Sequence, residues 1–98
     1  MRMMKLLLRK QQLLKYLGKP YTFKTIDMEN CIYLDMGDYD IEISAIKDRE
    51  IKFNIYVWRV KEGFEIVERY MDVEDDFDKV KKLLDEIRGK YEKVEELV

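Results

Sequence analysis

Carboxylates are the abundant reactive groups in this 98-residue chain, because histidine is absent and serine and cysteine each occur once. The commonest general base, and the usual activator of a nucleophilic thiol, are therefore missing. One spacing still permits metal chemistry: Asp40 lies on one predicted strand, and the triplet Glu50-Ile51-Lys52 opens the next. Two carboxylates beside a lysine could bind Mg²⁺ and position a water for phosphodiester hydrolysis.

This D…E-x-K pattern resembles that of the restriction-endonuclease-like nucleases, whose core also begins with a helix followed by an antiparallel meander. The resemblance implies that Asp40 and Glu50 would hold the metal ion and that Lys52 would assist. Here Lys47-Asp48-Arg49 precedes the triplet, which places it at a charged hairpin tip rather than inside an apolar strand. A Mg-dependent nuclease is therefore kept as an alternative function.

Other metal and cofactor motifs are incomplete. The four glycines are isolated, so the chain has no glycine-rich phosphate loop. The acids at positions 72, 74, 76 and 78 alternate as calcium ligands do, but the loop glycine and the terminal glutamate of such a site are missing. We expect neither a metal nor a cofactor, and we favour a non-enzymatic protein.

The hydrophobic pattern predicts a single α+β domain over residues 1–98. Leucines at helical spacing predict a helix over residues 3–17, which Gly18 and Pro20 end. A three-four apolar spacing from position 77 onward predicts a final helix that runs to Val98. Alternating residues between the helices predict an antiparallel meander of four or five strands, at 21–26, 31–36, 39–46, 51–60 and 64–71.

Both helices should cover one face of this sheet, the face that carries Ile32, Ile41 and Ile55. The opposite face then combines acids with aromatic rings, a surface typical of sites that bind Arg and Lys. We predict that it is a partner-binding surface, and the alternative is that another element or a second copy of the chain covers its rings. Its predicted binding residues are Tyr33, Asp35, Asp40, Glu42, Tyr56 and Trp58.

Charge is strongly separated along the chain, although the net charge is only −2. The first seven charged residues are all basic, from Arg2 to Lys24, and the next six are all acidic, from Asp27 to Glu42. The basic N-terminal helix could bind nucleic acid or an anionic membrane. Nucleic-acid binders usually carry a net positive charge, so we favour the interpretation that this helix lies across acidic parts of its own fold.

The C-terminal helix has a heptad-like apolar stripe that could support a homodimer. Its last apolar residues extend past the short strands, which is the reason for suspecting a dimer; these residues are Tyr91, Val94, Leu97 and Val98. The single cysteine excludes an internal disulfide and favours a reducing, cytoplasmic location. No signal peptide or membrane span is expected.

These features favour a protein-binding module that presents an acidic, aromatic sheet face to a basic partner. Nucleic-acid-handling enzymes carry such basic surfaces. In size and composition the chain is similar to small inhibitors of viral or mobile-element origin, such as anti-CRISPR and other anti-defence proteins, and to toxin-immunity proteins. We therefore expect an inhibitor that competes with DNA or RNA for its site, with direct nucleic-acid binding as a less favoured alternative.

Overall fold

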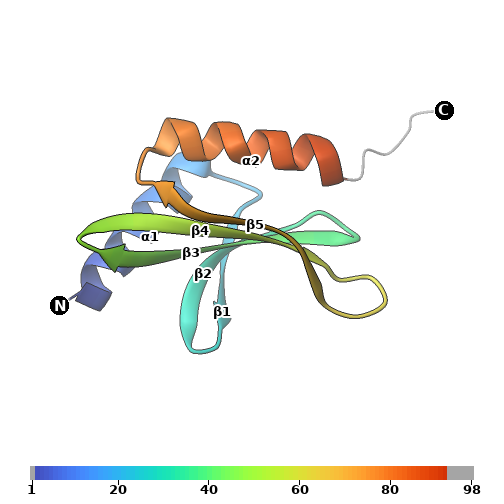
Figure 1. Cartoon of the computed structure of the whole chain (residues 1–98), viewed down its shortest axis with the longest axis horizontal. Helices are drawn as coiled ribbons and strands as arrows, with labels where there is room; N and C mark the ends of the chain where they lie inside the picture. Colours follow the sequence, from blue (N-terminus) through green and yellow to red (C-terminus); the bar gives the residue numbers. More distant parts are fainter. Residues whose placement is uncertain (1, 93–98) are drawn as a thin grey trace.

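The computed structural model describes residues 2–92, with side chains for residues 5–47 and 49–92. Both helices pack against one antiparallel sheet with the strand order β1-β2-β3-β4-β5 (Figure 1), and both contribute to the same hydrophobic core. This confirms the predicted α+β meander. The elements are α1 (Arg2–Leu17), β1 (Thr22–Ile26), β2 (Glu29–Asp35), β3 (Tyr39–Asp48), β4 (Glu50–Arg59), β5 (Glu65–Glu74) and α2 (Phe77–Tyr91).

The hydrophobic core lies between the helices and one face of the sheet. Ile43 of β3 pairs with Ile32 of β2 on one side and with Ile55 of β4 on the other, and all three are fully buried. Leu13 of α1 and Leu84 of α2 complete the same cluster. Neighbouring residues of a strand point to opposite faces, so this register sends the intervening polar residues to the other side. The predicted burial of the Ile32, Ile41 and Ile55 face is confirmed.

Several element boundaries differ from the predicted ones. The β3–β4 hairpin turns at Arg49 alone, which has a φ of 68°, instead of over residues 47–50. Strand β5 continues to Glu74 instead of ending at position 71 as predicted. Helix α2 ends at Tyr91, where Glu92 adopts an extended conformation shortly after the poor helix former Gly89. The later residues of the predicted dimer stripe lie outside the described residues.

Strand β5 forms one edge of the sheet and is irregular. Its pairing with β4 shifts twice, between Phe53 and Ile55 and between Val57 and Trp58. Near the first shift Asp72 has a φ of 57°, and its N–H donates to Oδ1 of the buried Asn54 at 3.0 Å. The side chain of Asn54 thus replaces a ladder hydrogen bond that the bulge removes.

Two basic residues of α1 make contacts within the molecule. The guanidinium of Arg9 donates to both carboxylate oxygens of Asp75 at 2.9 Å and lies 4.0 Å from the centre of the Phe77 ring. Lys10 is only 4% exposed, and its ammonium donates to the carbonyl of Asn30 at 2.7 Å. These contacts tie α1 to the start of α2 and to β2, as the intramolecular interpretation of the basic helix requires.

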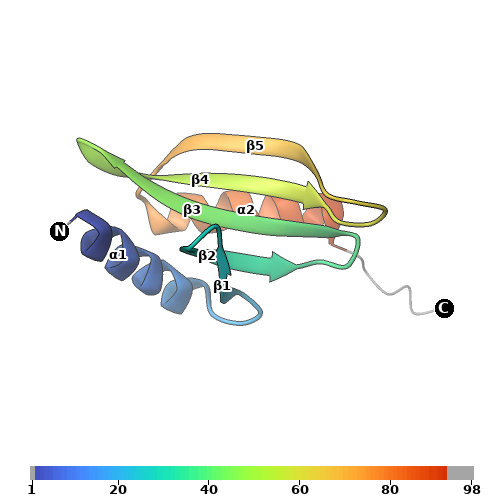
Figure 2. The ribbon, with the colours of Figure 1, turned by 90° about the horizontal axis from the view of Figure 1, so that it is seen from below.

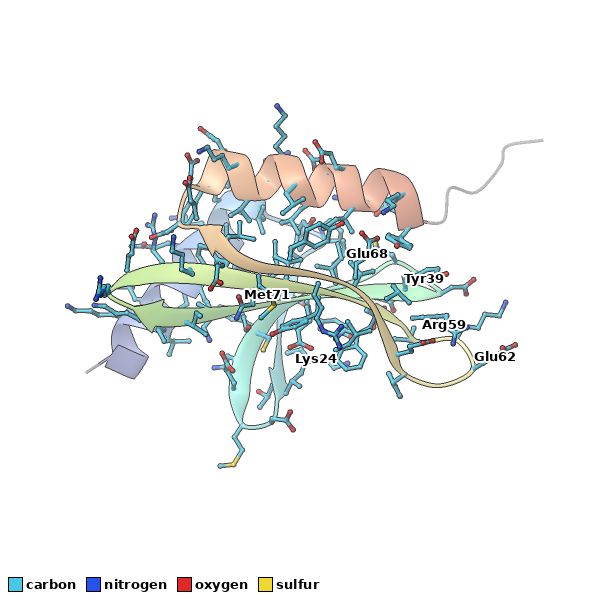
Figure 3. All side chains as sticks on the ribbon, viewed as in Figure 1. Lys24, Tyr39, Arg59, Glu62, Glu68 and Met71 are labelled. Atoms are coloured by element: carbon cyan, nitrogen blue, oxygen red, sulfur yellow. The ribbon has the colours of Figure 1, made fainter. Side chains whose placement is uncertain are left out.

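Glu68 of β5 joins the end of α2 to the sheet (Figure 3). Its carboxylate accepts hydrogen bonds from the hydroxyls of Tyr70 and Tyr91 and from the ammonium of Lys90, at 2.9 and 3.0 Å for the latter. These donors, led by Tyr70, lower the pKa of Glu68 to about 2. The ring of Tyr91 also packs 4.7 Å from that of Tyr39, so this part of the predicted dimer stripe is used within the chain.

The core contact of α1 gives a first prediction. Leu13→Ala should lower the free energy of unfolding by about 2–5 kcal/mol, because it leaves a cavity at a fully buried site. The matched control is Leu8→Ala on the same helix, where the side chain is 56% exposed, with an expected change within about 0.5 kcal/mol. Urea unfolding followed by circular dichroism measures both, and equal losses would contradict this account of the core.

The Glu68 cluster gives a second prediction. Because its pKa is lowered from 4.5 to about 2, Glu68 stabilises the fold above pH 4.5, and this contribution is lost as the pH falls towards 2. Glu68→Gln should cost roughly 1–2 kcal/mol at neutral pH and flatten the acid limb of the stability curve. Glu62→Gln, at an exposed turn, serves as the control. An unchanged acid limb in Glu68→Gln would show that the carboxylate does not act in this way.

Candidate functional site

The face of the sheet opposite α1 and α2, here termed the open face, is not covered by either helix (Figure 2). Two rows of side chains cross it. In one row Glu42 pairs with Tyr33 on β2 and with Tyr56 on β4, and in the other Asp40 pairs with Asp35 and with Trp58. The register therefore brings together, on one face, all six residues that the sequence predicted as a binding set.

These six residues differ in accessibility. Asp35 is exposed, the two tyrosines, Glu42 and Trp58 are half-buried, and Asp40 is only 7% exposed. The hydroxyl of Tyr33 donates to Oδ2 of Asp40, whereas Oδ1 has no hydrogen-bond partner among the described residues. Burial raises the pKa of Asp40, and the hydrogen bond from Tyr33 partly offsets this. Asp40 therefore lies beneath the surface and positions Tyr33, whose ring is also contacted by the ammonium of Lys24 at 4.2 Å.

The open face is concave. The β1–β2 hairpin projects from the sheet on the side away from α2 (Figure 1), and Lys24 of β1 lies on that side (Figure 3). Ile26 of β1 and Ile66 of β5, which belong to opposite edges of the sheet, line one cavity of about 310 Å³. The sheet is therefore curled around this open-face cavity. The full lining is Ile26, Asp27, Glu29, Cys31, Glu42, Ser44, Tyr56, Trp58 and Ile66.

Glu42 is the carboxylate on the floor of the open-face cavity. Its Oε1 accepts a hydrogen bond from the indole Nε1–H of Trp58 at 3.0 Å, and the thiol of Cys31 lies 3.9 Å from Oε2. Burial raises the pKa of Glu42, and the negative charges of Glu29 and Asp27 raise it further. Burial likewise raises the pKa of the Cys31 thiol to about 11, which makes it a poor nucleophile. The site is thus suited to binding a cation rather than to covalent chemistry.

Sequence reasoning missed the wall of this cavity. It predicted a turn near Asp27 but no bend that would carry the turn over the open face. The turn residues Asp27 and Met28 have φ values of 50° and 67°, the conformation of a two-residue hairpin turn that usually contains glycine. Ile26 and Glu29 flank the turn and enter the lining with it. The one sequence signal for a binding site here was the acidity of this segment, because Asp27 and Glu29 begin the run of six acidic residues.

The structure does not bring the nuclease-like residues together. Asp40 pairs with Trp58, eight residues along β4 from Glu50, a separation of about 26 Å at 3.3 Å per residue. Glu50 is exposed beside the hairpin turn, and Lys52 lies two residues further along β4. Within residues 2–92 no group of three or more potential ligands is arranged to hold a metal ion. This placement gives no support to the nuclease alternative.

A larger cavity, of about 630 Å³, lies between α1, the β1–β2 turn and the end of β3. Its walls include the aliphatic side chains of Leu6, Leu7 and Ile46. The ammonium of Lys10 also lines it but is bound to the carbonyl of Asn30. The lining of this larger cavity therefore does not indicate which kind of ligand it would bind. The open-face cavity is more informative because it combines carboxylates with aromatic rings.

Comparisons of the chain with protein-family models, with curated proteins and with solved structures found no match. Neither of the two helices in the described part of the chain is long and apolar enough to cross a membrane.

The contact between Trp58 and Glu42 gives a third prediction. Trp58 is the single tryptophan, so its indole N–H signal in a ¹H–¹⁵N spectrum reports on Glu42 alone among the carboxylates that could accept from it. Because the pKa of Glu42 is raised, the signal should titrate with a midpoint above 4.5. Glu42→Gln should abolish this step, while Glu86→Gln on α2 should retain it. A midpoint at or below 4.5, or a step that persists in Glu42→Gln, would contradict the described geometry.

Proposed function

We propose that this protein is a non-enzymatic binding module that presents its open face to a basic surface of a partner protein. The observation that carries the proposal is the open-face cavity, where Glu42 lies beside the rings of Tyr56 and Trp58. Carboxylates accept hydrogen bonds from Arg and Lys, and aromatic rings bind their cations. Half-buried Tyr and Trp at the centre of a concave surface are also the residues that most often dominate binding energy.

The proposed partner is a nucleic-acid-handling enzyme, because such enzymes use clusters of Lys and Arg to neutralise phosphates. The open face would occupy that basic surface and exclude DNA or RNA by steric and electrostatic competition. This mode of action would suit an inhibitor of viral or mobile-element origin, of the anti-CRISPR or immunity-protein kind. The free, buried Cys31 supports a reducing compartment, and we propose the cytoplasm.

Local charge, rather than net charge, supports the electrostatic part of this proposal. The net charge is only −2, but four acids lie on or beside the concave surface, namely Asp27, Glu29, Asp35 and Glu42. Lys10 forms an ion pair with one of these acids, Glu29, at 3.4 Å, whereas Asp27, Asp35 and Glu42 form no ion pair with another described residue. The open face can therefore attract a basic partner although the whole chain is nearly neutral.

A capture experiment tests the proposed function. Immobilised wild-type protein is incubated with a native extract of the source cells beside two open-face variants, Glu42→Lys and Trp58→Ala. Glu86→Lys is the matched control, since it makes the same charge change at an exposed position of α2. A partner of the open face should bind wild type and Glu86→Lys, and binding should weaken steeply from about 0.05 to about 0.5 M NaCl.

The captured protein is then purified, and its affinity for nucleic acid is measured with and without the added chain. Displacement of nucleic acid by wild type, but not by Glu42→Lys, is the expected result. Partners that bind all four proteins equally and are insensitive to salt would overturn the proposed function.

A further inference from the structure

We propose that the open-face cavity binds a single arginine side chain of the partner, with the guanidinium group between Glu42 and the rings of Tyr56 and Trp58. This inference rests on the proposed function and deepens it, because it names the chemical group that the open face recognises. It follows from the size of the cavity, the spread of its carboxylates and the hydrogen-bonding state of Glu42.

The size and lining of the cavity fit one long side chain. At about 310 Å³ it lies at the lower end of the range for small-ligand pockets. Ile26 and Ile66 supply apolar surface from its two sides, where the three methylene groups of an arginine stem could pack. The polar groups lie on the floor and at the β1–β2 turn. The cavity thus offers apolar surface for the stem of an arginine side chain and polar groups for its guanidinium.

The carboxylates are arranged for a broad cation rather than for a point charge. Asp27, Glu29 and Glu42 line the same cavity, yet no set of three ligands in the described chain is placed to hold a metal ion. Carboxylates that line one cavity but do not form a metal site are suited to a planar cation that donates hydrogen bonds in several directions. Guanidinium carries five N–H donors in a rigid plane, whereas the lysine ammonium is compact and strongly hydrated.

Glu42 retains capacity to accept hydrogen bonds. Its Oε1 is bound to Trp58, but the only donor that reaches Oε2 among the described residues is the weak thiol of Cys31, at 3.9 Å. Oε2 of Glu42 can therefore accept a hydrogen bond from a guanidinium group that enters the cavity.

The aromatic rings favour arginine over lysine for a second reason. Tyr56 and Trp58 lie in the cavity lining on either side of Val57 in β4, so both side chains project from the same face of one strand. Guanidinium stacks on aromatic rings through its flat surface while its edge donates to carboxylates. The combination of Glu42 with these rings can satisfy both surfaces of the group at once.

The experiment uses two peptides of equal charge, acetyl-hexaarginine amide and acetyl-hexalysine amide, titrated into the full chain. Binding is followed by the indole N–H signal of Trp58 and by tryptophan fluorescence, which comes from Trp58 alone. We expect the arginine peptide to shift the Trp58 signal and to bind about tenfold more tightly than the lysine peptide near 0.15 M NaCl. Glu42→Gln should remove most of this preference, because the amide can still accept from Trp58 but carries no charge.

Glu86→Gln is the control for charge, and circular dichroism of each variant confirms that it is folded. Equal affinities for the two peptides, or arginine-peptide binding that leaves the Trp58 signal unchanged, would overturn the arginine pocket. That result would leave the open face as a general acidic surface, so the proposed function would still depend on the capture experiment. Conversely, selective arginine binding at Trp58 would uphold the pocket even if the captured partners failed to depend on Glu42.

Discussion

Ile43 packs between Ile32 and Ile55 at the centre of the sheet, beneath both helices, and this row of three buried side chains constrains the rest of the molecule. A shift of one residue in either pairing would turn the isoleucines towards solvent and bring Glu42 and its neighbours into the core. The cost of burying those acids without partners would be large. The packing of the core therefore fixes which residues the open face displays.

The same constraint explains how a strongly divided charge pattern becomes a stable fold. The basic helix α1 must lie over the core because Leu13 is needed there, and its cations meet acids and carbonyls from elsewhere in the chain. Arg9 binds Asp75, and Lys10 binds the carbonyl of Asn30. The acids of β2 and β3 alternate with the buried isoleucines and so gather on the opposite side.

Much of this arrangement could be predicted from the sequence, because it depends on local periodicity. The alternation in β2, β3 and β4 was sufficient to place Tyr33, Glu42 and Trp58 on one face. The curl of the sheet was not predictable in the same way, since it depends on how the β1–β2 hairpin leaves β3 after only four paired residues. The approach of distant segments, such as Ile26 and Ile66 lining one cavity, has no signature in the spacing of residues. The extent of β5 was missed because Asp72 resembles a turn residue although it lies in a bulge.

The bulges of β5 also bear on how the protein behaves at high concentration. A straight strand of ten residues at the edge of a sheet would offer an unbroken row of N–H and C=O groups, on which another chain could add a strand. Here the pairing with β4 shifts twice, and such bulges bend and twist the edge strand. Met71 of β5 and Phe64, which precedes the strand, are both exposed. A regular edge strand would therefore also present apolar side chains to another chain. The irregularity of β5 therefore makes it harder for a strand of another molecule to pair with this edge.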